Sequence, residues 1–297
     1  MNILLSGGTG FIGTALVEQL ISSGHQVIIL SRQTLSDHGS CRYVGDLDEI
    51  PADQPIDAIV NLAGASMAGK RWSVQYKQEL LASRVETTRT LVQLCSRLEQ
   101  APHVFLSASA IGFYGPHADE VLDENGSSTS CFSSDLCQQW EAEAISANKH
   151  GLRIALMRFG VVLDREGGAL DDMKRPFKMG VANWMGGGEQ WLSWVHRADV
   201  IAAILFLLDR QDLSGPFNIT APESVTSRSF CAAMKKHYRT FVTLPVPAIV
   251  MRLLLGEVAD ELLLSGQRVF PAGLTAAGFK FSYPALDAAL EDIVNPG

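Results

Sequence analysis

The glycines near the start of the chain have the spacing of a phosphate-binding turn. Gly7, Gly10 and Gly13 satisfy G-x-x-G-x-x-G, and Gly8 completes the narrower G-x-G-x-x-G. A short apolar run before the turn is typical of a buried strand, and the residues from Phe11 to Ser23 follow a helical pattern. Glycines at this spacing allow a tight turn, close approach of the backbone to a pyrophosphate, and close packing of helix on strand. The turn therefore predicts dinucleotide binding, and the alternative is an empty turn of the same shape.

Two polar residues indicate which dinucleotide is bound. Ser31 and Arg32 follow a second buried strand, Gln26 to Leu30, at the strand end that would meet the adenine ribose. An acidic residue there would bind the free 2′-hydroxyl group of NAD, whereas an arginine accommodates a 2′-phosphate. The pair therefore predicts NADP(H), with Ser31 as a second phosphate donor. The alternative for Arg32 is a solvated arginine at a strand end.

Alternating strands and helices position these residues. Further apolar runs predict strands at 42–44, 58–60, 103–106, 153–158 and 216–219, and helical patterns cover 72–99, 133–148 and 197–208. This alternation predicts an α/β fold with a Rossmann-type, doubly wound parallel sheet that binds ligand at the carboxyl ends of its strands. We assign residues 1–160, completed by 197–220, to the NADP-binding domain. Residues 161–196 and 221–297 are assigned to a smaller, mainly helical substrate lobe.

The composition of the chain excludes several classes of protein. Its 297 residues are 47% hydrophobic and 19% charged, as in ordinary globular proteins, and the net charge of −8 argues against a nucleic-acid surface. Five scattered cysteines without C-x-x-C spacing favour a reduced, cytoplasmic protein that has neither structural disulfides nor a metal site. We find no secretory signal and no apolar segment long enough to span a bilayer, so no membrane partner is expected.

Several motifs, in order, resemble the extended branch of the short-chain dehydrogenase/reductase superfamily. They are the glycine turn, Asp46-Leu47, Asn61 to Gly64, Ser109 to Gly115, and His196 with Asp199. Three later runs, Pro245 to Pro247, Leu254 to Glu257 and Glu261 to Arg268, resemble the C-terminal lobe of its atypical epimerase family, or nucleoside-diphosphate-sugar epimerase-like proteins. The turn and the resemblance together predict a cofactor site of Gly7, Gly10, Phe11, Ile12, Gly13, Ser31, Arg32, Asp46, Leu47, Leu62, Ala63, Gly64, Glu79, Arg84, Ser107 and Val161.

The residues that carry proton transfer in the superfamily are largely replaced. The resemblance implies a serine, a tyrosine and lysine spaced Y-x-x-x-K, and an asparagine on the preceding long helix. Ser109 matches the serine, but Ser133 and Cys137 stand at the tyrosine and lysine positions and Arg84 at the asparagine position. A serine hydroxyl is too weak an acid to replace an activated phenol, and a cysteine brings no fixed positive charge. A proton would have to come from elsewhere.

The candidates for that proton source each have a structural alternative. Tyr114 is either an acid or a packed aromatic residue, and Cys137 is either reactive or a small buried hydrophobe. His196 either takes part in chemistry or, with Asp199, caps the start of a helix. Arg84 would contact cofactor phosphate or ribose, or else pair with Glu79 or Glu86. We assign Ser109, Tyr114 and Cys137 as the catalytic candidates.

Two classes of function remain. The first is an NADP(H)-dependent oxidoreductase or epimerase-type enzyme acting on a small hydroxylated or carbonyl compound. The second is a non-catalytic NADP(H)-binding redox sensor or partner-binding protein. The stretch Gly186 to Trp191 is either a lid over the substrate or a plain surface loop. Extended family members often dimerise through two long helices, so a homodimer through residues 72–99 and 133–148 is an expectation.

Overall fold

A computed structural model describes residues 1–295 of the chain, and its centre is a seven-stranded sheet. The strands run in the order β12-β7-β5-β4-β1-β2-β3, and every neighbouring pair is parallel. Their bounds are β1 Asn2–Ser6, β2 Gln26–Leu30, β3 Cys41–Val44, β4 Ala58–Asn61, β5 Val104–Ala110, β7 Arg153–Phe159 and β12 Gly215–Ile219. The strand order reverses between β1 and β4, which is where a doubly wound sheet opens a ligand crevice. The predicted fold class is confirmed.

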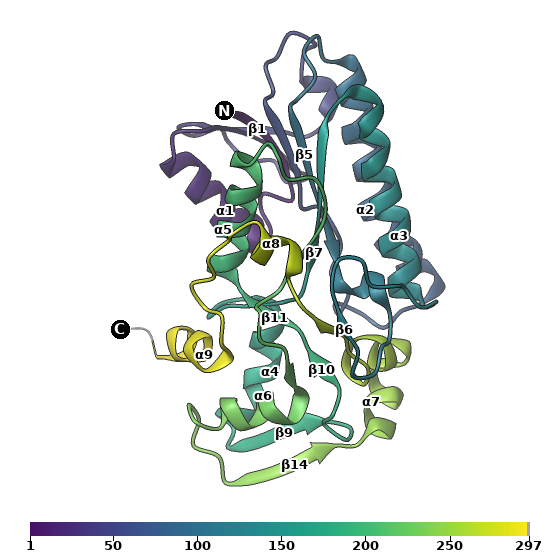
Figure 1. Cartoon of the computed structure of the whole chain (residues 1–297), viewed down its shortest axis with the longest axis vertical. Helices are drawn as coiled ribbons and strands as arrows, with labels where there is room; N and C mark the ends of the chain where they lie inside the picture. The colour runs from purple at the N-terminus through teal and green to yellow at the C-terminus, as the bar shows by residue number, and fades with distance from the viewer. Residues whose placement is uncertain (296–297) are drawn as a thin grey trace.

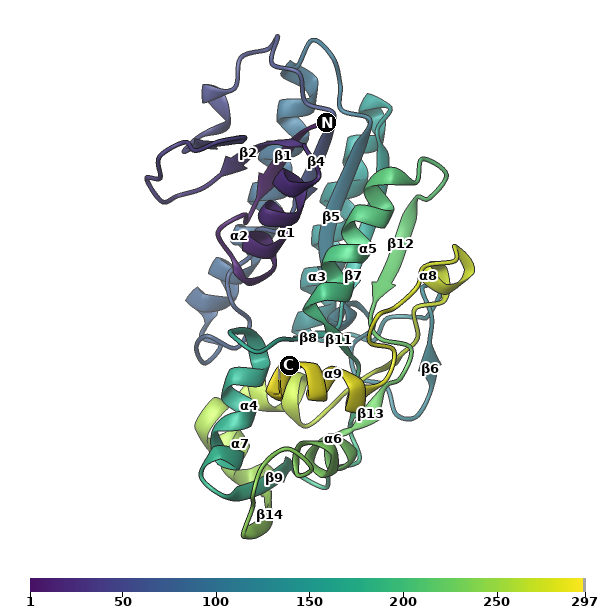
Figure 2. The same ribbon diagram turned by 90° about the vertical axis from the view of Figure 1, so that its left-hand side faces the viewer.

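Helices cover both faces of this sheet (Figures 1 and 2). Helices α1 (Phe11–Ser22) and α5 (Arg197–Asp209) pack together on one face, and α2 (Val74–Arg97) and α3 (Phe132–Ile145) on the other. Because the strands are buried on both faces, their apolar runs are nearly continuous rather than alternating. One core cluster lies on each side, with Leu5 and Val60 in the first and Leu4 and Ile59 in the second.

The element boundaries differ slightly from those expected from the sequence. Helix α3 ends at Ile145, and a 3-10 helix over Ser146–His150 continues it to Gly151, which is left-handed (φ +77°). Helix α2 begins at Val74 because the Ser73 hydroxyl accepts a hydrogen bond from the Tyr76 N–H and caps it. Strand β5 extends to Ala110, so Ser107 and Ser109 lie within the strand rather than after it.

The remaining chain builds the expected mainly helical lobe around a core of its own. Its helices are α4 Gly168–Lys178, α6 Ser227–Met234, α7 Ala248–Leu255, α8 Ala272–Ala276, α9 Leu286–Val294 and a π-helix over Ala259–Leu263. Four short strand pairs, which the sequence did not indicate, also form: three lie within this lobe, and the fourth joins it to residues 121–122 of the larger domain. They are β9 (Val181–Met185) with β14 (Val242–Val246), β8 (Val161–Leu163) with β11 (Trp194–His196), β10 (Trp191–Leu192) with β13 (Val225–Thr226), and β6 (Val121–Leu122) with β15 (Arg268–Val269). Strands of two to five residues are too short to carry a clear periodic pattern.

Within residues 1–295, no helix is both long and apolar enough to cross a membrane.

Candidate functional site

The glycine turn between β1 and α1 is shaped by close backbone contacts. Gly7 has a φ of +74°, and a Cβ atom there would lie 2.7 Å from the carbonyl carbon and oxygen of Leu62. A Cβ atom on Gly13 would overlap the Gly7 carbonyl oxygen and lie 2.7 Å from the Cα atom of Gly8. Gly7 therefore provides the tight turn, and Gly13 provides the close packing of α1 on it.

The first turn of α1 offers backbone donors to an anion. Its N-cap is Gly10, which has no side chain to cap the helix, and no acidic residue stands in the first turn. The first N–H groups of a helix have no partner within the helix, and the helix dipole adds positive potential there. The N–H groups of Phe11, Ile12 and Gly13 therefore fit a pyrophosphate, as the sequence predicts.

Arg197 holds this turn in place from far along the chain. Its guanidinium group donates a 3.2 Å hydrogen bond from Nη1 to the Phe11 carbonyl oxygen and lies 5.0 Å from the centre of the Phe11 ring. Asp164 pairs with Arg197 at 2.6 Å, and Gly167 packs against the same ring. Sequence reasoning missed Arg197, because no local pattern links it to the glycine turn.

The predicted 2′-phosphate residues lie at the carboxyl end of β2. Ser31 is buried, and its hydroxyl oxygen accepts a 3.1 Å hydrogen bond from the Gln33 N–H, which leaves its proton free to donate. Arg32 is exposed, and among the described residues it forms no ion pair. An exposed, unpaired guanidinium beside a buried hydroxyl fits a phosphate group. Nearby, Asp46 caps the 3-10 helix Leu47–Glu49 through the Asp48 N–H, and Leu47 is buried.

The loop after β4 lies between the glycine turn and Arg84. The residues Leu62 and Ala63 contact Gly7, and a Cβ atom on Gly64 would lie 3.0 Å from the Arg84 guanidinium carbon. Arg84 donates from Nη2 to the Ala65 carbonyl oxygen at 2.9 Å and from Nη1 to its own helix at Leu80. Burial lowers the pKa of Arg84.

The alternative ion pair of Arg84 with Glu79 or Glu86 is absent from the described chain. Glu79 is exposed on another side of α2, and Glu86 pairs with Arg89 at 2.8 Å.

Two other predicted cofactor contacts, Ser107 and Val161, lie on β5 and β8. Ser107 is fully buried beside Asn61, and the Val161 N–H donates to Ser193. Direct contact of Glu79, Arg84, Ser107 and Val161 with a cofactor stays a prediction.

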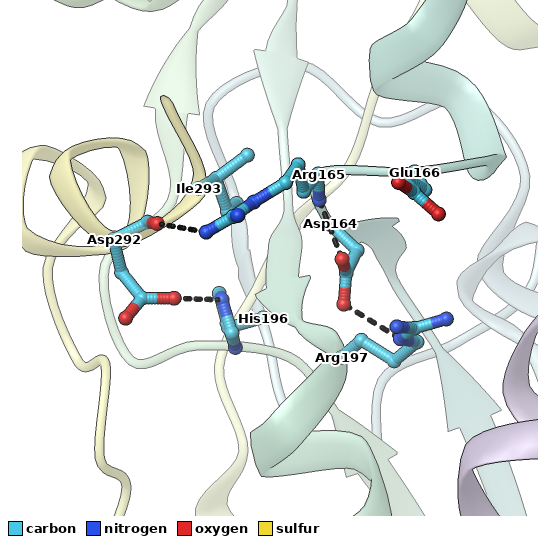
Figure 3. Close-up of a pocket in the computed structure, with 7 residues that line it drawn as sticks. All are labelled: Asp164, Arg165, Glu166, His196, Arg197, Asp292 and Ile293. Atoms are coloured by element: carbon cyan, nitrogen blue, oxygen red, sulfur yellow. Dashed lines mark hydrogen bonds and ion pairs between the residues drawn. The ribbon is translucent and has the colours of Figure 1, made fainter. Parts of the chain in front are cut away.

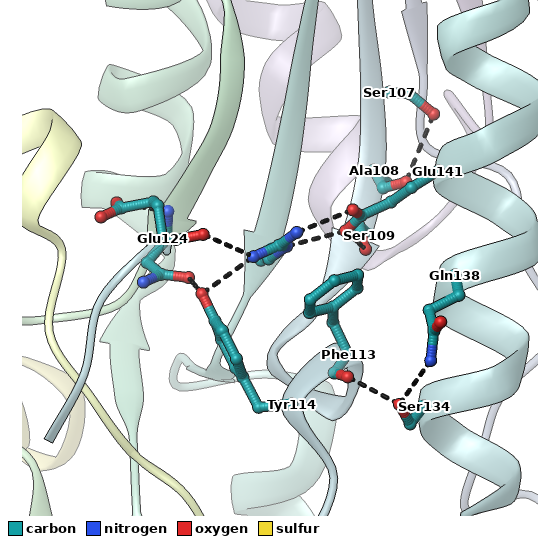
Figure 4. A network of polar contacts seen from close by, with 11 residues as sticks. Ser107, Ala108, Ser109, Phe113, Tyr114, Glu124, Ser134, Gln138 and Glu141 are labelled. Atoms are coloured by element: carbon teal, nitrogen blue, oxygen red, sulfur yellow. Dashed lines mark hydrogen bonds and ion pairs between the residues drawn. The ribbon is translucent and has the colours of Figure 1, made fainter. Parts of the chain in front are cut away.

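Ser109 and Tyr114 belong to one buried polar network (Figure 4). The Ser109 hydroxyl donates to Glu141 Oε1 at 2.6 Å. Arg158 donates from Nε and Nη2 to the two Glu141 oxygens, each at 2.8 Å, and from Nη1 to the Tyr114 hydroxyl at 3.0 Å. Tyr114 in turn donates to Asn218 Oδ1 at 2.7 Å. All five side chains are at least nine-tenths buried.

The network makes Tyr114 a poor acid in this structure. Burial raises the pKa of Tyr114, although Arg158 and Asn218 act to lower it. Its hydroxyl group already donates one hydrogen bond and accepts another, both within the protein. The packed-aromatic alternative accounts for these contacts, and a catalytic role of Tyr114 stays a prediction.

Ser133 and Cys137 lie one helical turn apart on α3, on the face that meets the end of β5. A Cβ atom on Gly112 would contact the Cβ atom of Ser133 at 3.3 Å and the Cys137 Sγ atom at 3.8 Å. Ser133 donates to Glu261 from both its N–H (2.8 Å) and its hydroxyl (2.6 Å). A carboxylate from the C-terminal lobe therefore binds the residue that stands at the tyrosine position. Sequence reasoning did not assign Glu261, because only the folded chain brings the two segments together.

The Cys137 thiol stays protonated at neutral pH. Burial raises the pKa of its thiol to about 12, and the nearby charge of Glu141 adds to the shift. The thiolate, the form that reacts, is therefore strongly disfavoured at neutral pH.

Thiol labelling tests this description of the cysteines. In the native protein at pH 8 we expect Ellman's reagent to modify only Cys131, which is partly exposed, whereas the four other cysteines are buried. Cys137 should react only after unfolding. Cys131→Ser removes the native reaction if this is correct, and an undiminished fast reaction in that variant would contradict it.

His196 lies outside the network of Figure 4. Its Nδ1 atom accepts the Ala198 N–H at 3.1 Å and caps α5, which confirms the alternative that the sequence offered for it. Asp199 accepts the N–H groups of Ser282 and Tyr283. Burial lowers the pKa of His196. His196 lines a pocket of about 270 Å³ with Asp164, Arg165, Glu166, Arg197, Asp292 and Ile293 (Figure 3).

The Gly186–Gly188 loop joins β9 to β10 and is tied into the lobe. The Gln190 side-chain amide donates to the carbonyl oxygens of Met185 (3.0 Å) and Leu263 (2.8 Å). The Trp191 indole N–H donates to Asp119 at 2.9 Å. Movement of this loop as a lid would have to break these bonds.

Among residues 1–295, no cluster of His, Cys, Asp and Glu side chains is arranged to hold a metal ion.

The model of the NAD dependent epimerase/dehydratase family matches residues 3–220. The chain belongs to this family. Residues 246–293 match a domain of unknown function, DUF1731, which covers the later runs that resembled the C-terminal lobe of the epimerase subgroup. The family resemblance seen in the sequence is confirmed, and the chain has the NAD(P)-binding fold of this family.

Several relatives match nearly the whole chain. An epimerase family protein of Staphylococcus aureus (strain MRSA252) is 38% identical over 303 residues, covering 98% of each chain. One of Mycobacterium leprae is 36% identical, covering 97% of this chain and 94% of the relative. Among solved structures, human epimerase family protein SDR39U1 (isoform 2) with NADPH superimposes with a TM-score of 0.88 at 33% identity and full coverage of both chains. A nucleoside-diphosphate sugar epimerase from Corynebacterium glutamicum gives 0.77 at 28% identity, covering 99% of this chain and 58% of that one.

Proposed function

We propose that this chain binds NADP(H) at the carboxyl edge of the sheet and acts as an oxidoreductase or epimerase-type enzyme on a small hydroxylated or carbonyl compound. The observation that carries the proposal is the first turn of α1. Its N–H groups have no side-chain cap, and the close packing at Gly7 and Gly13 holds the helix end against the glycine turn. Arg32 and Ser31 support the phosphorylated dinucleotide, and a human relative with 33% identity was solved with NADPH.

In this proposal, separate groups of the chain bind the cofactor and the substrate. The N–H groups of the α1 turn hold the pyrophosphate, and Arg32 with Ser31 holds the 2′-phosphate. When bound, the nicotinamide supplies or accepts a hydride. Since Ser109 donates its own proton to Glu141, it has a lone pair to offer to a substrate hydroxyl group.

The second candidate is a cofactor-binding redox sensor or partner-binding protein without turnover. Specific observations favour it. Cys137 is neutral at physiological pH, the Tyr114 hydroxyl is occupied within the protein, and Ser133 is bound to Glu261. NADPH oxidation in a screen of carbonyl compounds would support the enzyme, whereas a conformational change on NADPH addition without turnover would support the sensor.

We also propose a cytoplasmic location. All five cysteines are free in the described chain, including the partly exposed Cys131, as in proteins of reducing compartments.

Calorimetric titration with NADPH and NADH tests the cofactor assignment. We expect NADPH to bind at least tenfold more tightly than NADH, a difference of about 1.4 kcal/mol. In Arg32→Ala, NADPH affinity should fall by about 10- to 100-fold, since a hydrogen bond between charged groups contributes roughly 1.5–3 kcal/mol. NADH affinity should hardly change.

The control is Arg175→Ala, which removes another exposed cation, on α4. Equal affinities for the two nucleotides would refute the role of Arg32 and leave the fold untouched. If neither nucleotide binds, the functional proposal must be abandoned.

A further inference from the structure

Arg84 is a buried cation that has no carboxylate partner in the described chain. Histidine aside, four charged residues of residues 1–295 are buried, namely Arg84, Glu141, Arg158 and Asp199. Arg158 pairs with Glu141 at 2.8 Å, and Asp199 accepts two backbone N–H groups. Buried charges are normally paired, because removing a lone charge from water is costly. The unpaired charge of Arg84 therefore points to a role beyond the packing of α2.

Neutral groups hold the guanidinium group of Arg84 in place. Nη2 donates to the Ala65 carbonyl oxygen at 2.9 Å, and Nη1 donates to the Leu80 carbonyl oxygen at 3.1 Å. The guanidinium carbon lies 5.2 Å from the centre of the Trp140 ring on α3. Carbonyl oxygens and an aromatic face stabilise a cation without cancelling its charge. Burial lowers the pKa of Arg84, but an arginine stays charged in proteins at neutral pH.

The guanidinium group lies at the crevice of the sheet, next to the loop that follows β4. A Cβ atom on Gly64 in this loop would lie 3.0 Å from the guanidinium carbon, and the neighbouring Leu62 and Ala63 contact Gly7 of the glycine turn. In the sheet, β4 and β5 lie on one side of β1, and β2 lies on the other. Arg84 and Arg32 therefore stand on opposite sides of the glycine turn.

This arrangement assigns Arg84 to one end of the cofactor. With the 2′-phosphate at the end of β2 and the pyrophosphate at α1, as proposed above, a dinucleotide crosses β1 and its nicotinamide end lies toward β4 and β5. Arg84 is thus a cation on the nicotinamide side of the crevice, whereas Arg32 is a cation on the adenine side.

The charge of Arg84 also acts on α3, which packs beside α2 (Figure 1). Burial and then Glu141 raise the pKa of Cys137, whereas the charge of Arg84 acts to lower it. Arg89 on the same helix is different, because it is exposed and bonds Glu86 (2.8 Å) and Glu143 (3.0 Å). Helix α2 therefore carries one neutralised cation at its surface and one uncompensated cation toward the crevice.

We propose that Arg84 makes the nicotinamide end of the crevice electropositive and so selects the reduced cofactor, an inference that rests on the cofactor assignment above. The oxidised nicotinamide ring carries a positive charge and the reduced ring carries none. A fixed cation nearby therefore repels the oxidised form alone, and more strongly where protein replaces water. A mixture of the two forms would load the chain chiefly with NADPH. A contact of Arg84 with phosphate would instead favour both forms alike.

Calorimetric titration of the full chain with NADP⁺ and with NADPH tests the proposal without a substrate. We expect the wild-type chain to bind NADPH more tightly. Arg84→Met should reduce this preference, the ratio of the two dissociation constants, by about 5- to 30-fold, because the repulsion of the oxidised ring is lost. Arg84→Lys keeps a positive charge and should hold the ratio within about twofold of the wild-type value. Circular dichroism should show native folding of both variants, since removal of an unpaired buried charge is well tolerated.

Two controls separate this effect from the other roles of a cation. Arg89→Met removes an exposed cation from the same helix and should leave both affinities unchanged. Arg32→Ala should weaken NADP⁺ and NADPH by the same factor, because both carry the 2′-phosphate, and the ratio should stay at the wild-type value.

Two results would overturn the proposal while leaving the cofactor assignment intact. One is an equal change of both affinities in Arg84→Met, which would make Arg84 a phosphate or ribose contact or a part of the fold alone. The other needs no variant: a wild-type chain that binds NADP⁺ as tightly as NADPH. If the wild-type chain binds neither nucleotide, the cofactor assignment itself fails, and this inference fails with it.

Discussion

Arg158→Met should destabilise the protein by about 3–5 kcal/mol, the usual effect of removing one partner of a buried ion pair. The side chains of Arg158 and Glu141 are 5% and 6% exposed, and two hydrogen bonds of 2.8 Å join them. Without the guanidinium group, the Glu141 carboxylate stays buried and retains only the Ser109 hydroxyl as a donor. Urea unfolding at pH 7 measures the change in the free energy of unfolding.

Two further variants establish the cause of that loss. Arg158→Met/Glu141→Leu removes both charges, and most of the stability should return because no buried charge remains unpaired. Arg175→Ala breaks an exposed pair with Asp172 and should change the free energy of unfolding by about 1 kcal/mol or less. If Arg158→Met were no more harmful than Arg175→Ala, the carboxylate would have to be solvated, and the network of Figure 4 would need revision.

Structural features that depend on residues close together in the chain could be predicted from the sequence. The strands of the main sheet are apolar runs between turn residues. Helix α2 places Leu80, Thr88 and Leu91 on its buried face at helical spacing. The hydrophobic pattern therefore predicts both the strands and the helix. The two roles of glycine that the structure tests, the tight turn at Gly7 and the close packing at Gly13, follow from the spacing of the motif alone.

The contacts that hold the site together could not be predicted in the same way. Arg197 reaches Phe11 across 186 positions, and Glu261 reaches Ser133 across 128. Each is an ordinary charged residue in its own segment, and only the folded chain gives it a partner: α5 packs beside α1, and the C-terminal lobe packs on α3. For the same reason, sequence reasoning placed Tyr114 near the chemistry without seeing that Arg158 and Asn218 occupy its hydroxyl group.

The C-terminal lobe contacts α3 at the position where the superfamily resemblance implies a tyrosine. Here Ser133 binds a carboxylate of the C-terminal lobe, and the partly buried aromatic pair Trp72–Phe132 packs beside it with ring centres 4.9 Å apart. The C-terminal lobe is therefore bonded to the first turn of α3 through the Glu261 carboxylate.

Gly13→Ala should reduce NADPH affinity by at least about 100-fold, or roughly 2.7 kcal/mol. The added methyl group would overlap the Gly7 carbonyl oxygen and lie 2.7 Å from the Gly8 Cα atom, and backbone atoms cannot rotate away as a side chain could. Helix α1 would have to move off the turn, which would carry the N–H groups of Phe11 and Ile12 away from the pyrophosphate. Gly187→Ala is the matched control, since no atom lies within 4 Å of a Cβ atom there. Calorimetric titration should show native affinity for the control and little binding for Gly13→Ala, with native circular dichroism for both. Because the overlap is local to the turn, retained NADPH binding in Gly13→Ala would mean that the cofactor does not rest on α1.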